Sequence, residues 1–159
     1  PAGVTVVLVH DDFLQRRKQP LPTMLDYGIH AERRFNTPPT FPIYMVEKVG
    51  RWLLNQGGLE AIHTRNERKA ALLYDALDAS DFYHGTVAPA DRSSMNVTFR
   101  LINEDLEPAF IQKAEDAGLL SLKGHRSVGG MRASIYNAMP EEGVRALVDF
   151  MEEFERTHG

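Results

Sequence analysis

Four potentially cationic side chains and three glycines fall within the ten residues from Lys123 to Arg132. Guanidinium groups form paired hydrogen bonds with carboxylate and phosphate oxygens, and glycine lets backbone N–H groups approach a ligand closely. The stretch therefore predicts a site for a small ligand that carries two anionic groups. Arg132 opens an expected strand, so its position would be firmer than that of a side chain on the loop. A solvated basic turn has the same composition and remains the alternative.

A second candidate anion site precedes an expected helix. Asn36 and Thr37 are followed by two prolines and Thr40, and the fixed φ of proline suits the first turn of a helix. Side-chain donors beside the unsatisfied N–H groups of a helix start form a pocket for phosphate. Ordinary capping of the helix by Thr37 is the alternative, and it needs no ligand.

Other candidate residues give weaker signals. The chain has six histidines, and the five other than His125 are scattered without the spacing of a metal site. Ser127 lies two residues from His125, which does not by itself indicate a nucleophile and its base. Because the chain contains no cysteine, disulfides and thiolate metal sites are excluded, and a reducing cytoplasm is the simplest expectation.

Composition and charge restrict the class of protein. The 159 residues suffice for one domain with a sizeable core, and 43% of them are hydrophobic. The 22 acidic and 18 basic residues give a net charge of −4, which argues against a general nucleic-acid or membrane-surface binder. No apolar run approaches the roughly 20 residues that span a bilayer.

The chain begins with an almost uninterrupted β-branched run at residues 4–9. Such a run is typical of a strand buried on both faces of a sheet that helices cover. A strand of this kind needs paired neighbours, which the remaining sequence does not obviously supply. We therefore expect one strand of a larger domain, in a chain cut from a longer protein. A processed chain with a natural strand near its start is the alternative.

Periodicity predicts the elements that follow. A helix is expected from about Thr37 to Asn55 and a second one over about residues 59–77, with a loop over residues 80–94. From residue 95 the order is strand, helix, strand, strand, helix. These elements are expected at about 95–101, 103–118, 119–122, 131–136 and from about 140 onward.

This order predicts an α/β protein whose small domain is of the α+β type, a small sheet packed with helices. The residue 4–9 strand would be left over from a large domain. The expected division is residues 1–40, a remnant of that large domain with a connector, and residues 41–159, a linking helix with the small domain.

The stretch Gly124–Pro140 resembles the carboxyl-terminal signature of the phosphoserine aminotransferase family, pyridoxal-phosphate enzymes of fold type I. The segment Phe35–Thr40 is similar to a helix-opening motif of that family. Further segments fit in the family's order, so the resemblance covers essentially the whole chain: Ser80–Tyr83, Arg92–Val97 and Phe154–Arg156.

The resemblance implies a reversible amino transfer between L-glutamate and 3-phosphohydroxypyruvate, which gives O-phospho-L-serine and 2-oxoglutarate. In that family this reaction serves the biosynthesis of serine and, in bacteria, also that of vitamin B6. By similarity, Asn36 and Thr37 would hold the phosphate of pyridoxal 5'-phosphate from the neighbouring subunit of a homodimer. His125 and Arg126 would bind the distal phosphate or carboxylate of the substrate, and Arg132 its α-carboxylate.

The resemblance also implies that this chain has no catalytic residue of its own. In the family the Schiff-base lysine lies a few residues before a strand that starts like Pro1–Val4. We therefore expect the isolated chain to be inactive, with small-molecule partners and neither nucleic acid nor membrane. Two alternatives stay open: a phosphate-binding regulatory module, and another fold-type I enzyme such as a relative of the cysteine desulfurases.

Overall fold

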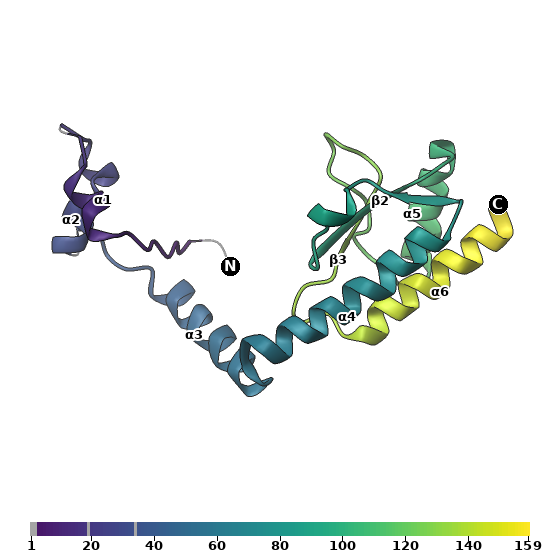
Figure 1. The fold of residues 1–159 in the computed structure, drawn as a ribbon, viewed down its shortest axis with the longest axis horizontal. Coiled ribbons are helices and arrows are strands. Elements are labelled where there is room, and N and C mark those ends of the chain that lie inside the picture. Colours follow the sequence, from purple (N-terminus) through teal and green to yellow (C-terminus); the bar gives the residue numbers. More distant parts are fainter. Residues whose placement is uncertain (1–2, 19, 34) are drawn as a thin grey trace. The chain divides into compact units, whose positions relative to one another are not determined.

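The structure is a computed structural model that describes residues 3–18, 20–33 and 35–159 (Figure 1). Pro1 and Ala2, which begin the family-like start of the chain, lie outside the described residues. The chain divides into two compact units, residues 1–55 and 56–159. The expected division after residue 40 concerns the domains of a longer protein and stays a prediction. In the described part of the chain, no helix is long and apolar enough to cross a membrane.

The first unit consists of short segments around one longer helix. Its elements are α1 (Asp11–Gln15), the 3-10 turn η1 (Thr23–Leu25), α2 (Tyr27–Glu32) and α3 (Thr40–Asn55). Only Asp26 and Gly28 are buried among its described residues. Asp26 caps α2 by accepting the N–H of Gly28 at 2.9 Å, and its carboxylate pairs with Arg17 at 3.3 Å. This unit is therefore held by polar contacts and has no buried apolar core of its own.

The strand predicted at residues 4–9 is not formed. These residues carry no strand, and Val6 and Leu8 are 74% and 95% exposed. Backbone N–H and C=O groups in a strand need partners on a neighbouring strand. The sheet in the described residues contains only strands of the second unit. The β-branched pattern was a correct indication of a segment suited to a sheet, but the prediction of a strand was wrong because nothing pairs with it here.

The second unit is an α+β fold, as the sequence predicted, and its sheet consists of three antiparallel strands. The strands β1 (Tyr83–Gly85), β2 (Asn96–Leu101) and β3 (Met131–Ser134) lie in that order in the sheet. The helices are α4 (Gly58–Ala79), α5 (Glu107–Asp116) and α6 (Glu141–His158), and the 3-10 turns are η2 (Pro89–Asp91) and η3 (Glu104–Leu106). Figure 1 shows α4 and α6 running side by side, in direct contact, along the sheet.

One face of the sheet forms the core with the three helices. Residues along β2 alternate between buried and half-buried, and Val97, Phe99 and Leu101 are completely buried. The ring of Phe110 on α5 lies 6.0 Å from that of Phe99 and 5.0 Å from that of Phe154 on α6. Because side chains alternate along a strand, the polar residues of β2 and β3 share the opposite face.

Two local predictions in this unit were wrong. Residues 80–94 were predicted to be a loop but contain β1, a strand of three residues that pairs with the end of β2. Residues 119–122 were predicted to be a strand but form a turn, because Gly118 and Ser121 have φ angles of 83° and 63°. Left-handed backbone at two positions interrupts an extended run, whatever its apolar side chains favour.

Lys69 is completely buried in the second unit and has no carboxylate beside it. Its ammonium group donates to the carbonyl oxygens of Ile135, Tyr136 and Met139 at 3.0, 2.7 and 3.0 Å. Burial, and secondarily the charge of Arg65, lower the pKa of Lys69. The lysine thereby connects α4 to the segment that follows β3.

Replacing Lys69 by methionine should destabilise the second unit by about 2–4 kcal/mol, because one buried and two partly buried carbonyl oxygens lose their donor. Urea unfolding of the chain measures this loss. Lys48→Met is the matched control, since Lys48 is half-exposed and contacts only side chains of its own helix. Equal stability of the Lys69→Met variant and the native chain would contradict the structural role of this ammonium group.

Candidate functional site

The basic stretch forms a closed loop between Lys123 and Met131, which pair across its base. The N–H of Gly124 donates to the carbonyl oxygen of Gly130 at 2.8 Å. Inside the loop, the carbonyl oxygen of His125 accepts two backbone N–H groups, from Val128 and Gly129, at 2.9 and 2.8 Å. The loop is therefore held by its own backbone, which leaves its side chains free for a ligand.

Its three glycines are required by this geometry. Gly129 and Gly130 have φ angles of 76° and 64°, in the left-handed region that disfavours residues with a Cβ. A Cβ at Gly130 would lie 2.9 Å from both Cγ of Arg100 and the carbonyl oxygen of Phe99. A Cβ at Gly124 would overlap the carbonyl oxygen of Gly129. The loop therefore packs too tightly for any other residue at positions 124 and 130 without a shift.

The ring of His125 presents one defined donor. The backbone N–H of Ser127 donates to Nδ1 of His125 at 3.3 Å, and the hydroxyl of Ser127 lies 2.7 Å from the same nitrogen. A backbone N–H only donates, so Nδ1 is an acceptor and the neutral ring carries its proton on Nε2. His125 is thus set to donate a hydrogen bond to an anion. Ser127 serves as the local support of this ring and makes no case for a nucleophile.

Arg132 lies on β3, directly opposite Thr98 of β2. Its side chain is half-buried, and its Nε atom is buried without a hydrogen-bond partner. Within the described ranges, no carboxylate forms an ion pair with this guanidinium group. A partly buried cation without a counter-charge is costly, and a bound carboxylate would satisfy both its charge and its donors.

The structure brings His125 and Arg132 to one small cavity. This cavity has a volume of about 90 Å³, and its walls include the paired hydroxyls of Thr86 and Thr98, whose oxygens lie 2.6 Å apart. Arg126 lines a neighbouring, larger cavity of about 550 Å³, which His125 also borders. The three residues predicted to bind a dianion therefore line two cavities that share His125.

The sequence analysis missed the residues that complete these cavities. Thr86, Thr98 and Arg100 lie on the polar face of the sheet or beside it, and none of them belongs to a recognisable motif. The alternation along β2 was a usable signal for Thr98 and Arg100, because it places both on the face opposite the core. The pairing of Thr98 with Arg132 depends on strand register, which the sequence does not display.

Asn36 and Thr37 lie in the first unit, just before α3. The helix begins at Thr40, so Thr37 is not its capping residue. Both side chains are exposed, and neither forms a hydrogen bond within the described ranges. The alternative interpretation of Thr37 was that it caps the helix without any ligand. Because α3 begins three residues later, this interpretation is excluded. An amide and a hydroxyl next to the N-terminal end of a 16-residue helix fit the phosphate of a cofactor.

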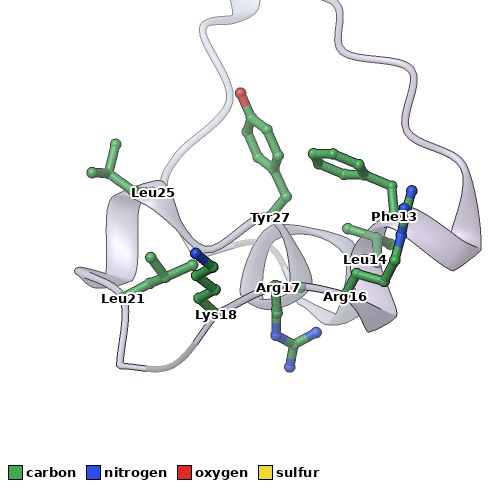
Figure 2. Close-up of a pocket in the computed structure, with 9 residues that line it drawn as sticks. Phe13, Leu14, Arg16, Arg17, Lys18, Leu21, Leu25 and Tyr27 are labelled. Atoms are coloured by element: carbon green, nitrogen blue, oxygen red, sulfur yellow. The ribbon is translucent and has the colours of Figure 1, made fainter.

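The first unit also contains a cavity of about 460 Å³, which is lined by both apolar and basic side chains (Figure 2). Figure 2 shows the rings of Phe13 and Tyr27 at one end and the guanidinium of Arg17 turned away from them. Arg17 pairs with Asp26, and Nε of Arg16 donates to the carbonyl oxygen of Asp12 at 3.3 Å. Lys18 also lines this cavity, but Arg16 and Arg17 both have partners within their own unit, so the two guanidinium groups give no comparable indication of an anion site.

Comparisons with known proteins agree on one family. The family model described as aminotransferase class-V matches residues 1–147. A phosphoserine aminotransferase from Laribacter hongkongensis (strain HLHK9) is 57% identical over 162 residues, which cover 100% of this chain and 45% of that protein. The chain thus spans less than half the length of this curated relative.

Solved structures agree with the sequence comparison. The phosphoserine aminotransferase of Bacillus circulans subsp. alkalophilus superposes with a TM-score of 0.88 at 50% identity, over 95% of this chain and 43% of that one. The PLP-bound phosphoserine aminotransferase from Trichomonas vaginalis gives a TM-score of 0.81 at 39% identity, over 89% of this chain and 41% of that one.

A Gly130→Ala substitution should destabilise the second unit by about 2–3 kcal/mol, because it combines a left-handed backbone with close contacts. Gly118→Ala is the matched control, since Gly118 has a φ of 83° but nothing within 4 Å of the added Cβ. The control should lose only about 1 kcal/mol in urea unfolding. Equal losses for the two variants would show that the contact with Arg100 and Phe99 is not tight.

Proposed function

Because this chain belongs to the class-V aminotransferase family, we propose that it is the carboxyl-terminal part of a phosphoserine aminotransferase. The longer protein would transfer an amino group reversibly between L-glutamate and 3-phosphohydroxypyruvate, with pyridoxal 5'-phosphate as cofactor. In this proposal it works as a cytoplasmic homodimer. The observation that carries the proposal is Arg132, a half-buried cation without an anionic partner, in one cavity with His125.

Arg132 is assigned the α-carboxylate of the substrate. Its guanidinium offers two parallel N–H donors to a carboxylate, and β3 holds it more firmly than a loop would. The backbone N–H of Arg132 donates to the carbonyl oxygen of Leu122 at 2.7 Å, which adds a further backbone hydrogen bond at this position. Both amino-acid substrates carry an α-carboxylate, so one arginine serves both half-reactions.

His125 and Arg126 are assigned the second anion of each substrate. Phosphoserine carries a phosphate there and glutamate carries a carboxylate. The Nε2–H of His125 donates one hydrogen bond, and Arg126 supplies a permanent charge on an exposed side chain. A loop whose backbone is closed by its own hydrogen bonds keeps these two side chains at a fixed distance from β3.

Asn36 and Thr37 are assigned the phosphate of the cofactor. The support is that both side chains have free donors at the start of α3, where the helix dipole also favours an anion. The bound cofactor supplies an electron sink that allows an amino group to leave one carbon skeleton and enter another. The lysines of this chain are given no catalytic role in the proposal, and the buried Lys69 is already engaged by carbonyl oxygens.

The first test is transamination of O-phospho-L-serine with 2-oxoglutarate by the full-length protein with added pyridoxal 5'-phosphate. L-cysteine is the competing amino donor, because a cysteine desulfurase relative would not need a distal anion site. Production of glutamate from phosphoserine, and much less turnover of cysteine, is the expected result. Preference for cysteine would refute the proposal.

Substitutions should separate the two anion sites. Arg132→Met should lower kcat/KM by about 100-fold for phosphoserine and for L-serine alike, because both carry the α-carboxylate. Arg126→Met should lower kcat/KM by about tenfold for phosphoserine only, because L-serine has no second anion. Arg156→Met is the control, since Arg156 pairs with Glu153 on α6 at 2.6 Å. Identical effects of the first two variants on both substrates would contradict these assignments.

A further inference from the structure

We propose that Arg100 is a positioning residue for the anion-binding loop, and that it acts in two ways. Its side chain supports the glycine pair at the end of the loop, and its guanidinium neutralises two carboxylates that would otherwise compete with the substrate. The inference rests on the proposed function for the identity of the anion. The contacts of Arg100 stand without it.

The guanidinium of Arg100 is committed to two glutamates. Nε donates to Oε1 of Glu107 at 3.1 Å and Nη2 donates to Oε2 at 3.3 Å, which is the forked arrangement of a strong arginine–carboxylate pair. Nη2 also lies 2.9 Å from the carboxylate of Glu104. Glu107 is 8% exposed, so its charge would be costly without this partner.

The stem and the tip of Arg100 also contact the loop. A Cβ at Gly129 would lie 3.3 Å from Nη2 of Arg100, and one at Gly130 would lie 2.9 Å from its Cγ. The two glycines therefore lie directly on this side chain. Because Glu107 and Glu104 hold the guanidinium from the other side, Arg100 is a fixed support for the backbone that leads into β3 and Arg132.

The charge of Arg100 matters because of what lines the larger cavity. Glu104, Asp105 and Glu107 border the same cavity as Lys123, His125 and Arg126. Without Arg100, the two glutamates would be unneutralised carboxylates in the cavity that holds the proposed anion-binding side chains. An internal carboxylate at such a site competes with the ligand and repels it. Arg100 removes the part of this competition that comes from Glu104 and Glu107, because it pairs with both.

This arrangement assigns different roles to two arginines on the same face of the sheet. Arg132 is unpaired and therefore able to bind an anion, whereas Arg100 is already neutralised and is not a ligand. Composition alone would count both as part of one basic patch. The two arginines therefore differ in their partners and not in their residue type: Arg132 is the proposed anion-binding residue and Arg100 is the residue that supports the loop.

The test uses the full-length protein with Arg100→Met, which keeps the apolar stem and removes the charge. The affinity for inorganic phosphate, measured calorimetrically, and KM for phosphoserine should each weaken about tenfold, with kcat within about twofold of the native value. In the triple variant Arg100→Met/Glu104→Gln/Glu107→Gln, both quantities should return to within about threefold, because the competing charges are gone. Arg156→Met is the matched control on α6 and should change neither quantity.

Rescue by the two glutamines is the decisive outcome, because a variant that had merely lost structure would not regain phosphate affinity. An unchanged affinity in Arg100→Met, or a loss that the triple variant does not recover, would overturn the inference. If Arg100→Met does not fold, Arg100→Gln replaces it, and native phosphate affinity in that variant, which also lacks the charge, would equally overturn the inference. The full-length protein could show the expected loss and recovery of phosphate affinity and yet not transaminate phosphoserine. That result would refute the proposed function and leave the inference about Arg100 standing.

Discussion

The antiparallel pairing of β2 with β3 is the constraint on which the candidate site depends. It places Phe99 opposite Met131 on the core face and Thr98 opposite Arg132 on the polar face. A slip of one residue would bury Arg132 and expose the aromatic core, because side chains alternate along a strand. The burial of the core therefore fixes the register, and the register fixes the position of Arg132, the residue proposed to bind the anion.

A second organising principle is the treatment of positive charge. Lys69 is satisfied by carbonyl oxygens, Arg100 by two glutamates, and Arg92 by a forked pair with Asp78, whose pKa this hydrogen bonding lowers. Arg132 has no such partner in the described part of the chain, and its Nε is buried. These three cations are therefore satisfied within the fold, whereas Arg132 is available for the external anion proposed for it.

The two units differ in how they are stabilised. The second unit has a continuous apolar core in which Phe99, Phe110 and Phe154 interlock. The first unit buries only Asp26 and Gly28 among its described residues and exposes large apolar side chains such as Leu8. Asn36 and Thr37 therefore belong to a segment that relies on local polar contacts, whereas the proposed substrate-binding residues lie on a unit with a packed core.

The sequence by itself determined the helices α3 to α6, the strands β2 and β3, the α+β class and the family, because periodic apolar patterns and the Gly124–Pro140 stretch are local properties. It did not predict the short helices α1 and α2. It failed at residues 4–9 and 119–122, where pairing or left-handed backbone overrode an apolar pattern. It named Arg132, which lies in the glycine-rich basic stretch, but not Arg100, which belongs to no recognisable motif. Only tertiary structure decided that Arg100 is neutralised by glutamates and Arg132 is not, because a charge is defined by its neighbours in space and these come from different elements.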